Sequence, residues 1–468
     1  MATVSIWWLR RDLRLGQNPA LQAALENSQT VLPVYILDPV LLRRPAPNRQ
    51  GFLFAGLRAL DADLRARGSR LIVRAGTPLV ELRRLLEESG AAVIYAVEDT
   101  SPYARRRDGA IARDLPLFLT GGSTVHPPGA MHKAEGGAYT VFTPFSKAWK
   151  SLPLGRFVTA SIPSTFPPVP ALESLAIPPG EAPPGFPAGE AEAQRRLAEF
   201  LAGPIFDYSR DRNRMDLAGT SELSPYFRFG MLSPREAACT AIAAARQAPD
   251  EATRTGAETW LNELIWREFY SSILYYFPNV LKEAFQPGLR AIPWRCAPED
   301  LRAWQDGRTG YPVVDAAMRQ LAQSGWMHNR ARMIAASFLV KNLLINWQEG
   351  ESWFMRHLVD GDPAANNGGW QWTAGVGTDA APYFRVFNPV LQSARFDPHG
   401  AYIRRWVPEL ADVPTEWIHT PWLLPAALQA EFHCRIRQDY PAPLVDTAST
   451  RQRALDAYRA SKGRWEKI

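Results

Sequence analysis

The first 130 residues alternate between short apolar stretches and longer amphipathic ones. The apolar stretches cover residues 3–9, 30–37, 70–76 and 92–99, with helical patterns at 18–27 and 49–68 and a helix start at Thr77-Pro78. Continuous apolar runs without polar alternation are typical of parallel strands that are buried on both faces. This pattern predicts an α/β domain with a doubly wound parallel sheet, whose ligands bind beyond the carboxyl ends of the strands.

A different composition follows. Nine of the 30 residues from Ser161 to Glu190 are Pro, which predicts an extended linker that wraps across the surface. From about Ala191 onwards the periodicity is helical, and the clearest patterns cover 257–277 and 313–347, the second divided by Gly325. We therefore expect an α/β domain at 1–130, a linker at 131–190 and an all-helical domain at 191–468.

Charge and cysteine usage narrow the class of protein. Lys+Arg less Asp+Glu is 53 − 47 = +6, which favours a polyanionic partner without establishing one. Three Cys form no CxxC pair, and no apolar run approaches the roughly 18 residues of a membrane span. The start of the chain lacks the pattern of a signal peptide. We expect a cytoplasmic monomer with no membrane partner.

Common site motifs are missing from the sequence. It contains no GxxxxGK[ST] phosphate-binding loop. The G-x-G-x-x-A match at 375–380 follows no apolar strand, so we do not interpret it as a dinucleotide-binding fingerprint. The seven His are scattered without HExxH spacing, so we expect no metal site. The chain has 16 Trp, and nine of them fall between Trp260 and Trp372. A helical core explains some of these, and stacking on a planar ligand or on bases explains more.

Several short stretches allow both a structural and a functional interpretation. The hydroxyls of "AGTSELSP" suit either helix capping or a bound phosphate. Glu263 is placed for an ordinary i,i+4 ion pair with Arg267, yet it also shares a helix face with Trp266. The basic run "WMHNRARM" suits a solvated helix face. In "DGDPAANNGGWQW", at 360–372, carboxylates, amides, Gly and Trp occur together, which favours a polar planar ligand nearby.

Five stretches taken in order carry a family resemblance. They are "WWLRRDLRLGQNPAL", "AGTSELSPYFRFGMLSP", "WLNELIWREFY", "TGYPVVDAAMRQLAQSGWMHNRARM" and "DGDPAANNGGWQWTAGVGTDAAPYFRVFNP". From about Val4 to about Tyr458 the chain resembles the photolyase/cryptochrome family, and most closely its class I cyclobutane pyrimidine dimer photolyases. The resemblance implies an antenna domain, a linker and a helical FAD domain. It also implies a carbon–carbon lyase that splits dimers in ultraviolet-damaged DNA by light-driven electron transfer from reduced, anionic FAD to a flipped-out dimer.

The resemblance implies a role for each matching residue. The positions that hold the FAD diphosphate and its neighbouring groups are matched here by Tyr208, Thr220, Ser221, Leu223 and Ser224. Arg332 and Asp360 match an ion pair beside the flavin ring, and Asp362 matches an acceptor for the polar edge of the ring. Asn366 matches the position that faces N5. The positions that line the lesion pocket are matched by Glu263, Trp266, Asn329, Met333 and Trp372. The positions that contact DNA phosphates are matched by Arg212, Arg330 and Arg385. Glu263 is expected to steady the charge that develops on the dimer, and Trp370, Trp347 and Trp294 match a chain that carries electrons to oxidised FAD.

The second chromophore and the type of family member are separate questions. Methenyl-folate members have an Asn-Glu pair where this chain has Tyr103-Ala104, so the resemblance favours a deazaflavin or FMN, with Asp99 as a polar contact, or no antenna at all. Plant cryptochromes have Asp at the position of Asn366 and animal ones Cys, and six-four photolyases have His where Asn329 and Met333 stand. These residues favour a dimer photolyase over the alternatives, which are a cryptochrome-type photoreceptor without repair activity and a flavin-binding DNA module.

Overall fold

The computed structural model describes residues 2–133, 135–154, 162–382 and 384–465. The chain forms two compact units, and neither is continuous in sequence. Unit 1 comprises Met1–Asp207, Ser221–Pro278 and Val359–Ala364, and unit 2 comprises Tyr208–Thr220, Asn279–Leu358 and Ala365–Ile468.

Unit 1 contains a five-stranded parallel sheet in the order β3-β2-β1-β4-β5. The strands are β1 (Ala2–Leu9), β2 (Ser28–Leu37), β3 (Ile72–Ala75), β4 (Val93–Glu98) and β5 (Leu117–Gly122). The four predicted strands and the parallel sheet are confirmed. The prediction omitted β5, which is an edge strand with Phe118 63% exposed, so its sequence lacks the buried apolar run that marks the other four.

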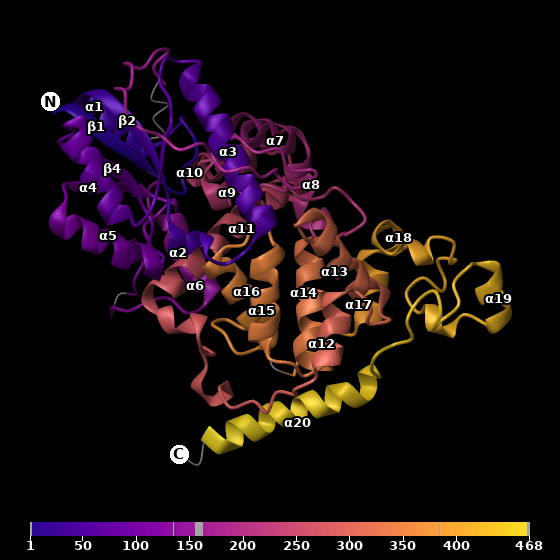
Figure 1. Cartoon of the computed structure of the whole chain (residues 1–468). Helices are drawn as coiled ribbons and strands as arrows, with labels where there is room; N and C mark the ends of the chain where they lie inside the picture. Colours follow the sequence, from indigo (N-terminus) through magenta and orange to yellow (C-terminus); the bar gives the residue numbers. More distant parts are fainter. Residues whose placement is uncertain (1, 134, 155–161, 383, 466–468) are drawn as a thin grey trace. The chain divides into compact units, whose positions relative to one another are not determined.

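Helices cover both faces of this sheet, as predicted for a doubly wound domain. They are α1 (Pro19–Asn27), α2 (Pro39–Leu42), α3 (Pro47–Arg65), α4 (Pro78–Ser89) and α5 (Pro102–Asp114). In Figure 1, α4 and α5 lie on one side of the strands and α3 on the other. Leu82, Leu85 and Ile111 form one core with Ile6 and Val34 of the sheet. Thr77 is the N-cap of α4 but makes no side-chain cap hydrogen bond.

The remaining helices of unit 1 lie before or after the Pro-rich region. They are η1 (Pro128–Ala130), α6 (Phe142–Ser151), α7 (Glu190–Ala202), α9 (Ser224–Phe229), α10 (Pro234–Gln247) and α11 (Glu251–Tyr276), while α8 (Pro204–Asp211) crosses into unit 2. Residues 162–188 contain no helix or strand, yet Leu175 N donates to Val73 O at 2.9 Å, and Phe166 and Phe186 are buried. This extended segment is therefore fastened to unit 1 by hydrogen bonds and apolar side chains.

The described residues of unit 2 form helices joined by turns and irregular segments, with one isolated bridge between Ile436 and Tyr440. Its helices are η2 (Pro278–Leu281), η3 (Pro287–Leu289), α12 (Pro298–Gln305), α13 (Pro312–Ser324), α14 (Asn329–Ser337), η4 (Phe338–Asn342), α15 (Trp347–His357), α16 (Pro363–Ala374), α17 (Pro389–Phe396), α18 (Ala401–Trp406), η5 (Pro408–Leu410), η6 (Pro421–Leu423), α19 (Ala426–Glu431) and α20 (Thr447–Trp465). Gly325 ends α13 with φ of 67°, a left-handed conformation that suits Gly, and α13 and α14 then pack side by side (Figure 1).

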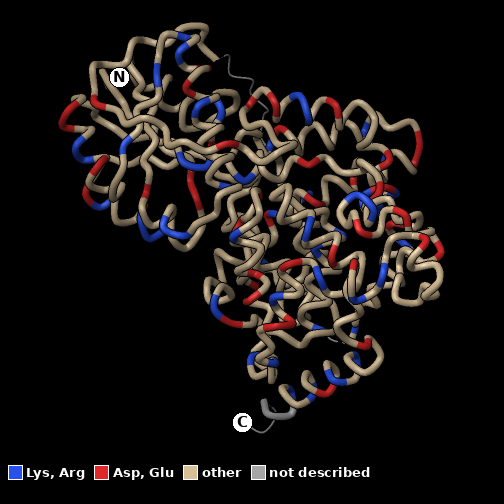
Figure 2. The backbone as a smooth tube through the Cα atoms, turned by 45° about the vertical axis from the view of Figure 1, so that its right-hand side comes forward, with Lys and Arg blue, Asp and Glu red and all other residues tan. Residues whose placement is uncertain are grey.

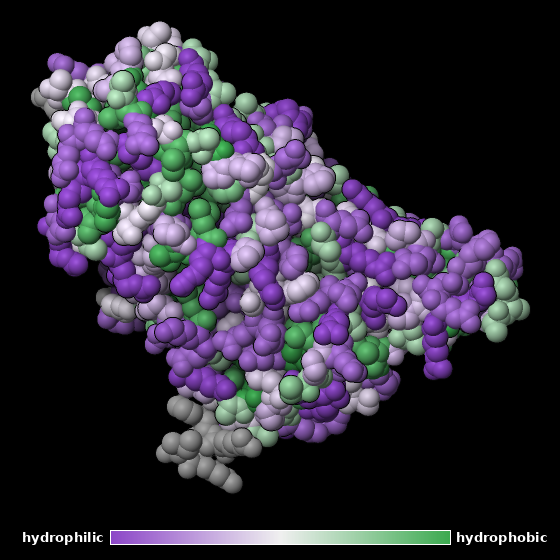
Figure 3. Space-filling model, viewed as in Figure 1, coloured by the Kyte–Doolittle hydropathy of each residue, from purple (hydrophilic) through white to green (hydrophobic). Residues whose placement is uncertain are grey.

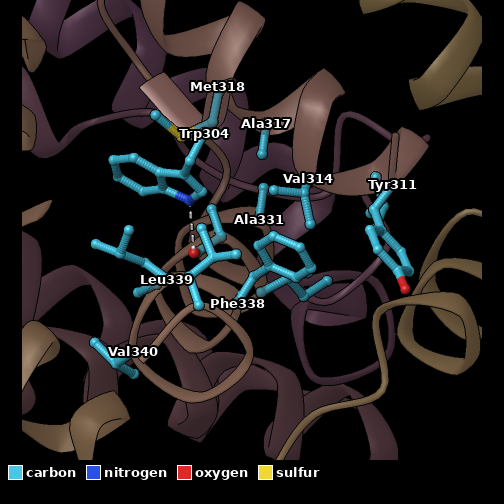
Figure 4. Close-up of a cluster of buried hydrophobic side chains, with 14 of the residues drawn as sticks. Trp304, Tyr311, Val314, Ala317, Met318, Ala331, Phe338, Leu339 and Val340 are labelled. Atoms are coloured by element: carbon cyan, nitrogen blue, oxygen red, sulfur yellow. Dashed lines mark hydrogen bonds between the residues drawn. The ribbon is translucent and has the colours of Figure 1, made fainter. Parts of the chain in front are cut away.

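The core of unit 2 lies around Trp304, which is fully buried (Figure 4). Its Nε1 donates to Ala335 O at 3.0 Å, so the indole packs among apolar side chains without leaving its polar group unpaired. Asp315 is a buried carboxylate at the edge of this core. It accepts from Thr309 N at 2.7 Å, Thr309 Oγ1 at 2.6 Å, Gly310 N at 3.1 Å and Tyr440 OH at 2.5 Å. The network joins α13 to the chain that precedes α20.

Charged residues of both signs are interspersed along both units (Figure 2), so the excess of +6 is not concentrated in one run of the chain. Hydrophilic residues predominate on the face in Figure 3. In the described part of the chain, no helix has the length and apolar character needed to cross a membrane. The described residues also contain no group of three or more His, Cys, Asp or Glu that could hold a metal ion.

Candidate functional site

The start of α14 carries four of the predicted site residues on its accessible side. Asn329 is exposed, and Arg330, Arg332 and Met333 are partly exposed, whereas Ala331 and the next apolar residues of the helix are buried. Asn329 and Met333 are one helical turn apart, so their side chains lie on the same face. The first two turns of α14 therefore present an amide, a thioether and guanidinium groups to a ligand.

Arg330 is the centre of a positively charged cluster within unit 2. Its Nη2 donates to Asn213 Oδ1 at 2.6 Å, and its guanidinium lies 4.4 Å from the centre of the Phe396 ring. Burial, and after it the neighbouring Arg212, Arg395 and Arg385, together lower the pKa of Arg330 to about 10. Four cations near one another favour an anionic ligand, because a phosphate relieves their mutual repulsion.

The structure thus brings together Arg212, Arg330 and Arg385, which are far apart in sequence. Arg395 was missed by the sequence analysis. It is exposed at the end of α17, and its guanidinium lies 5.2 Å from the centre of the same Phe396 ring. No motif marked Arg395, and only its place beside the other three identifies it.

His328 fixes the beginning of α14. It is the N-cap residue, and its Nδ1 accepts from Arg330 N at 3.1 Å. A ring nitrogen that accepts carries no proton, so the proton of the neutral ring is on Nε2. Burial, and after it the nearby arginines, chiefly Arg330 and Arg332, together lower the pKa of His328 to about 4. His328 is therefore neutral at physiological pH and holds Asn329 and Arg330 in the first helical turn.

On α16, the side chain of Asn366 has a defined orientation. Its Nδ2 donates to Glu351 O at 3.0 Å. Because a backbone carbonyl oxygen only accepts, the nitrogen of the amide must face Glu351, which leaves Oδ1 as an acceptor for another group. One turn later, a Cβ added at Gly369 would meet no atom within 4 Å. An acceptor beside open space fits the polar ring edge of a flavin.

The three Trp of the expected electron chain all belong to the core of unit 2. Trp370 is 2% exposed and Trp347 3%, whereas Trp294 is only partly buried, at the margin of the core. A Cβ at Gly350 of α15 would lie 2.0 Å from the Trp370 ring, so Gly350 leaves the space that this indole occupies. The order of exposure fits a path that leads from a buried indole towards the surface.

Unit 1 contains the turn that precedes α16. Asp362 Oδ2 accepts from Arg11 Nη2 at 2.7 Å, and its Oδ1 accepts from Ala364 N at 2.9 Å. Arg228 Nε donates to Gly361 O at 2.8 Å. Asp362 thus stabilises the first turn of the helix and pairs with Arg11, two residues beyond the end of β1. Its role as an acceptor for FAD stays a prediction.

A pocket in unit 1 lies at the carboxyl ends of β1, β4 and β5, and its lining includes Arg11, Asp99, Ser101, Ser123 and Asp362. Strand order reverses between β1 and β4, which is where ligands of open α/β sheets bind. Burial alone raises the pKa of Asp99, but the Arg11 guanidinium and the Ser101 N–H outweigh it and lower that pKa below its usual value. Asp99 is therefore an ionised acceptor in this pocket.

Two further groups of predicted residues lie in unit 1. Ser221 Oγ accepts from Trp260 Nε1 at 3.3 Å, Leu223 is buried, and Ser224 begins α9. On α11, Glu263 and Trp266 are partly exposed, and the Trp266 ring is stacked on Phe142, a residue that the sequence analysis did not single out.

The other predicted residues are divided between the two units. Tyr208 is buried, with the Arg212 guanidinium 5.6 Å from its ring centre. Thr220 and Trp372 are partly exposed. Arg332 belongs to unit 2, where its Nε donates to Met327 O at 2.8 Å, and the buried Asp360 belongs to unit 1. Their pairing stays a prediction.

Comparison with known proteins bears on the family of the chain. Residues 5–171 match the family described as DNA photolyase, and residues 260–460 match the FAD binding domain of DNA photolyase. The chain is 39% identical to the deoxyribodipyrimidine photo-lyase of Escherichia coli, over 98% of this chain and 99% of that protein.

Two solved structures share the fold. A bacterial class III photolyase from Agrobacterium tumefaciens superimposes with a TM-score of 0.92 and 35% identity, over 99% of this chain and 98% of that one. An archaeal photolyase from Sulfolobus tokodaii, described with two FAD molecules, gives 0.81 and 30%, over 98% and 100%. The α/β sheet, the helical FAD-binding region and the full-length similarity together show that this chain belongs to the DNA photolyase family.

Proposed function

We propose that the protein repairs ultraviolet-damaged DNA as a deoxyribodipyrimidine photo-lyase that splits cyclobutane pyrimidine dimers. The observation that carries this proposal is the Arg330 cluster, in which four guanidinium groups lie beside the accessible first turn of α14. Such a cluster suits the phosphates on either side of a flipped nucleotide pair. The full-length similarity to photo-lyases supports the same activity.

FAD, when bound, supplies the light absorption and the electron that opens the cyclobutane ring. The chain's own residues hold and orient it. Asn366 offers Oδ1 to a ring N–H, and as a neutral amide it adds no charge beside an anionic ring. The hydroxyls of Thr220, Ser221 and Ser224 suit the diphosphate, with Tyr208 and Leu223 beside it. Arg332, Asp360 and Asp362 complete the polar contacts of the ring.

The lesion is held by stacking and by one carboxyl group. Trp266 and Trp372 each stack on the dimer, since an indole face stacks on any base. Asn329 and Met333 contact it from α14. Glu263 hydrogen-bonds the pyrimidine edge and stabilises the charge that develops as the ring opens.

Trp370, Trp347 and Trp294 pass electrons from the surface to oxidised FAD. Trp370 and Trp347 are both buried and Trp294 is partly exposed, which supports Trp294 as the outer member. Trp294 is the member in reach of external reductants, because it is the one at the margin of the core. This chain of residues prepares the cofactor and takes no part in splitting the dimer.

A second chromophore is proposed for the pocket of unit 1, where Asp99 and Arg11 are ionised contacts. A deazaflavin or FMN is favoured over methenyltetrahydrofolate, since Tyr103 and Ala104 stand where folate binders have Asn and Glu. The archaeal relative described with two FAD molecules supports a flavin-like antenna. We further propose a cytoplasmic monomer with an antenna domain at 1–130, a linker at 131–190 and a catalytic domain at 191–468.

The test mixes reduced protein with a thymine oligonucleotide that contains dimers, illuminates with blue light and follows absorbance near the thymine maximum. Light-dependent recovery is expected. A protein that photoreduces its flavin but gives no recovery would instead be a cryptochrome-type photoreceptor.

A further inference from the structure

Trp266 packs against aromatic rings of its own unit. Its ring and that of Phe142 are parallel within 2°, with centroids 3.7 Å apart. Phe269 meets it edge-on at 5.5 Å and 86°, and Tyr270 lies 5.6 Å away with a tilt of 33°. The indole nevertheless remains partly exposed. One face is therefore covered by a flat ring, and surface remains for another.

The helix that supplies Phe142 is firmly attached to α11. Trp149 of α6 donates through Nε1 to the buried carboxylate of Glu268 at 2.7 Å, and Phe145 packs on Phe269 with centroids 5.3 Å apart. Phe142 is the first residue of α6, directly before this attachment. The ring beneath Trp266 is thus fixed to a rigid support rather than to a mobile loop.

A stacking side chain binds a base best when its plane is already set. An unsupported Trp has two free torsions, and their ordering on binding lowers affinity. A parallel ring at 3.7 Å restricts both torsions and shields one face from water. The other face then offers a fixed plane to a planar ligand.

We propose that Phe142 is a positioning residue that sets the plane of Trp266 for stacking on the flipped pyrimidine dimer. The inference rests on the proposed function, in which Trp266 contacts the lesion. Phe142 acts through Trp266, so it contributes to the preference for damaged over undamaged DNA. It does not contribute to general DNA affinity, which comes from phosphate contacts.

The experiment measures dissociation constants in the dark for the flavin-loaded protein. One single-stranded oligonucleotide contains a thymine dimer, and its partner has the same sequence without damage. Phe142→Ala is expected to bind the damaged strand about three- to tenfold more weakly, with unchanged binding of the undamaged one. Phe142→Tyr, which keeps a flat ring, restores the preference. Phe118→Ala, an exposed Phe on β5, is the matched control and changes neither constant.

Phe142→Leu keeps apolar volume without a flat ring, and it gives the same expected loss if the Ala variant does not fold. A double-mutant cycle with Trp266→Ala separates indirect from direct action. In the Trp266→Ala background, removing Phe142 should not weaken binding of the damaged strand any further. An additive loss, an equal loss for both strands, or tighter binding of damaged DNA would overturn the inference. If Trp266→Ala itself leaves the preference intact, the proposed role of Trp266 is what fails.

Discussion

Asn366 Nδ2 donates to Glu351 O across 3.0 Å, so the carbonyl of one helix sets the orientation of an amide on the next. Asn366→Asp replaces this donor by an oxygen, which faces the carbonyl oxygen and adds a negative charge. Loss of the hydrogen bond and the repulsion cost about 1–3 kcal/mol. We expect a lower yield of reduced flavin on illumination with an external donor, followed by absorbance.

The control for that variant is Asn388→Asp, at the exposed N-cap of α17. Its Oδ1 accepts from Val390 N and Leu391 N, a role that Asp fills equally well. Reduced-flavin yields that are the same in Asn366→Asp and the wild type would remove Asn366 from the flavin site.

Arg330→Gln should weaken binding of damaged and undamaged DNA alike. If Arg330 contacts a phosphate, its loss reduces the slope of log K against log salt by about 1. The measurement is a titration of labelled oligonucleotide at several salt concentrations. Arg435→Gln, on an exposed side chain paired with Asp439, is the control and should keep the wild-type slope. An unaltered slope in Arg330→Gln would place the phosphates elsewhere.

His328 makes stability depend on pH. Its pKa is about 4 in the folded protein and 6.5 in an unconstrained chain, so the unfolded state takes up the proton first as pH falls. The free energy of unfolding is therefore expected to fall between pH 6.5 and 4, by about 3 kcal/mol from this group.

His328→Asn keeps an N-cap acceptor and cannot titrate. Urea unfolding at pH 7, 5.5 and 4.5 should show a smaller loss in this variant than in the wild type. His433→Asn, on a side chain that is 82% exposed, should behave like the wild type. A loss that is identical in all three proteins contradicts the prediction.

Gly369 and Gly350 form a contrasting pair in neighbouring helices. Gly369→Ala adds a Cβ in open space and removes a flexible residue from a helix, so the flavin-free protein should gain up to about 1 kcal/mol. If a ligand uses that space, the same variant retains less FAD after dialysis. Gly350→Ala forces its Cβ against Trp370 and should cost about 1–3 kcal/mol. Thermal unfolding and flavin content distinguish the two.

Trp294→Phe should slow photoreduction of oxidised flavin and leave repair by pre-reduced protein largely intact. The reason is that Trp294 lies at the margin of the core, at the proposed outer end of the chain. Flash photolysis gives the first rate and dimer repair the second. A collapse of repair would show that Trp294 has another role.

The strands that could be predicted are those buried on both faces, because burial imposes continuous apolar sequence. The edge strand β5 was not predicted, because Phe118 faces solvent there and the strand lacks the continuous buried apolar sequence of the others. Likewise α6 falls within the region predicted as linker, because the high Pro content downstream of it concealed a short amphipathic helix.

For the site, sequence supplied residue identities through the family resemblance but not their mutual contacts. Arg395 and Phe142 carry no motif, and each gains meaning only from a neighbour that is distant in the chain. The stack of Phe142 on Trp266 depends on how α6 packs against α11, and no local periodicity encodes that packing. Contacts of this kind require the tertiary structure.

The hydrogen bond from Tyr440 to the buried Asp315 bears on how the gene tolerates nonsense mutations. Every proposed site residue lies at or before Arg395, so a stop codon between that position and Tyr440 would spare them all. It would nevertheless take one of the donors from a carboxylate that has no access to water, and remove α20 from the core of unit 2. Such alleles are expected to yield misfolded protein rather than a shortened enzyme.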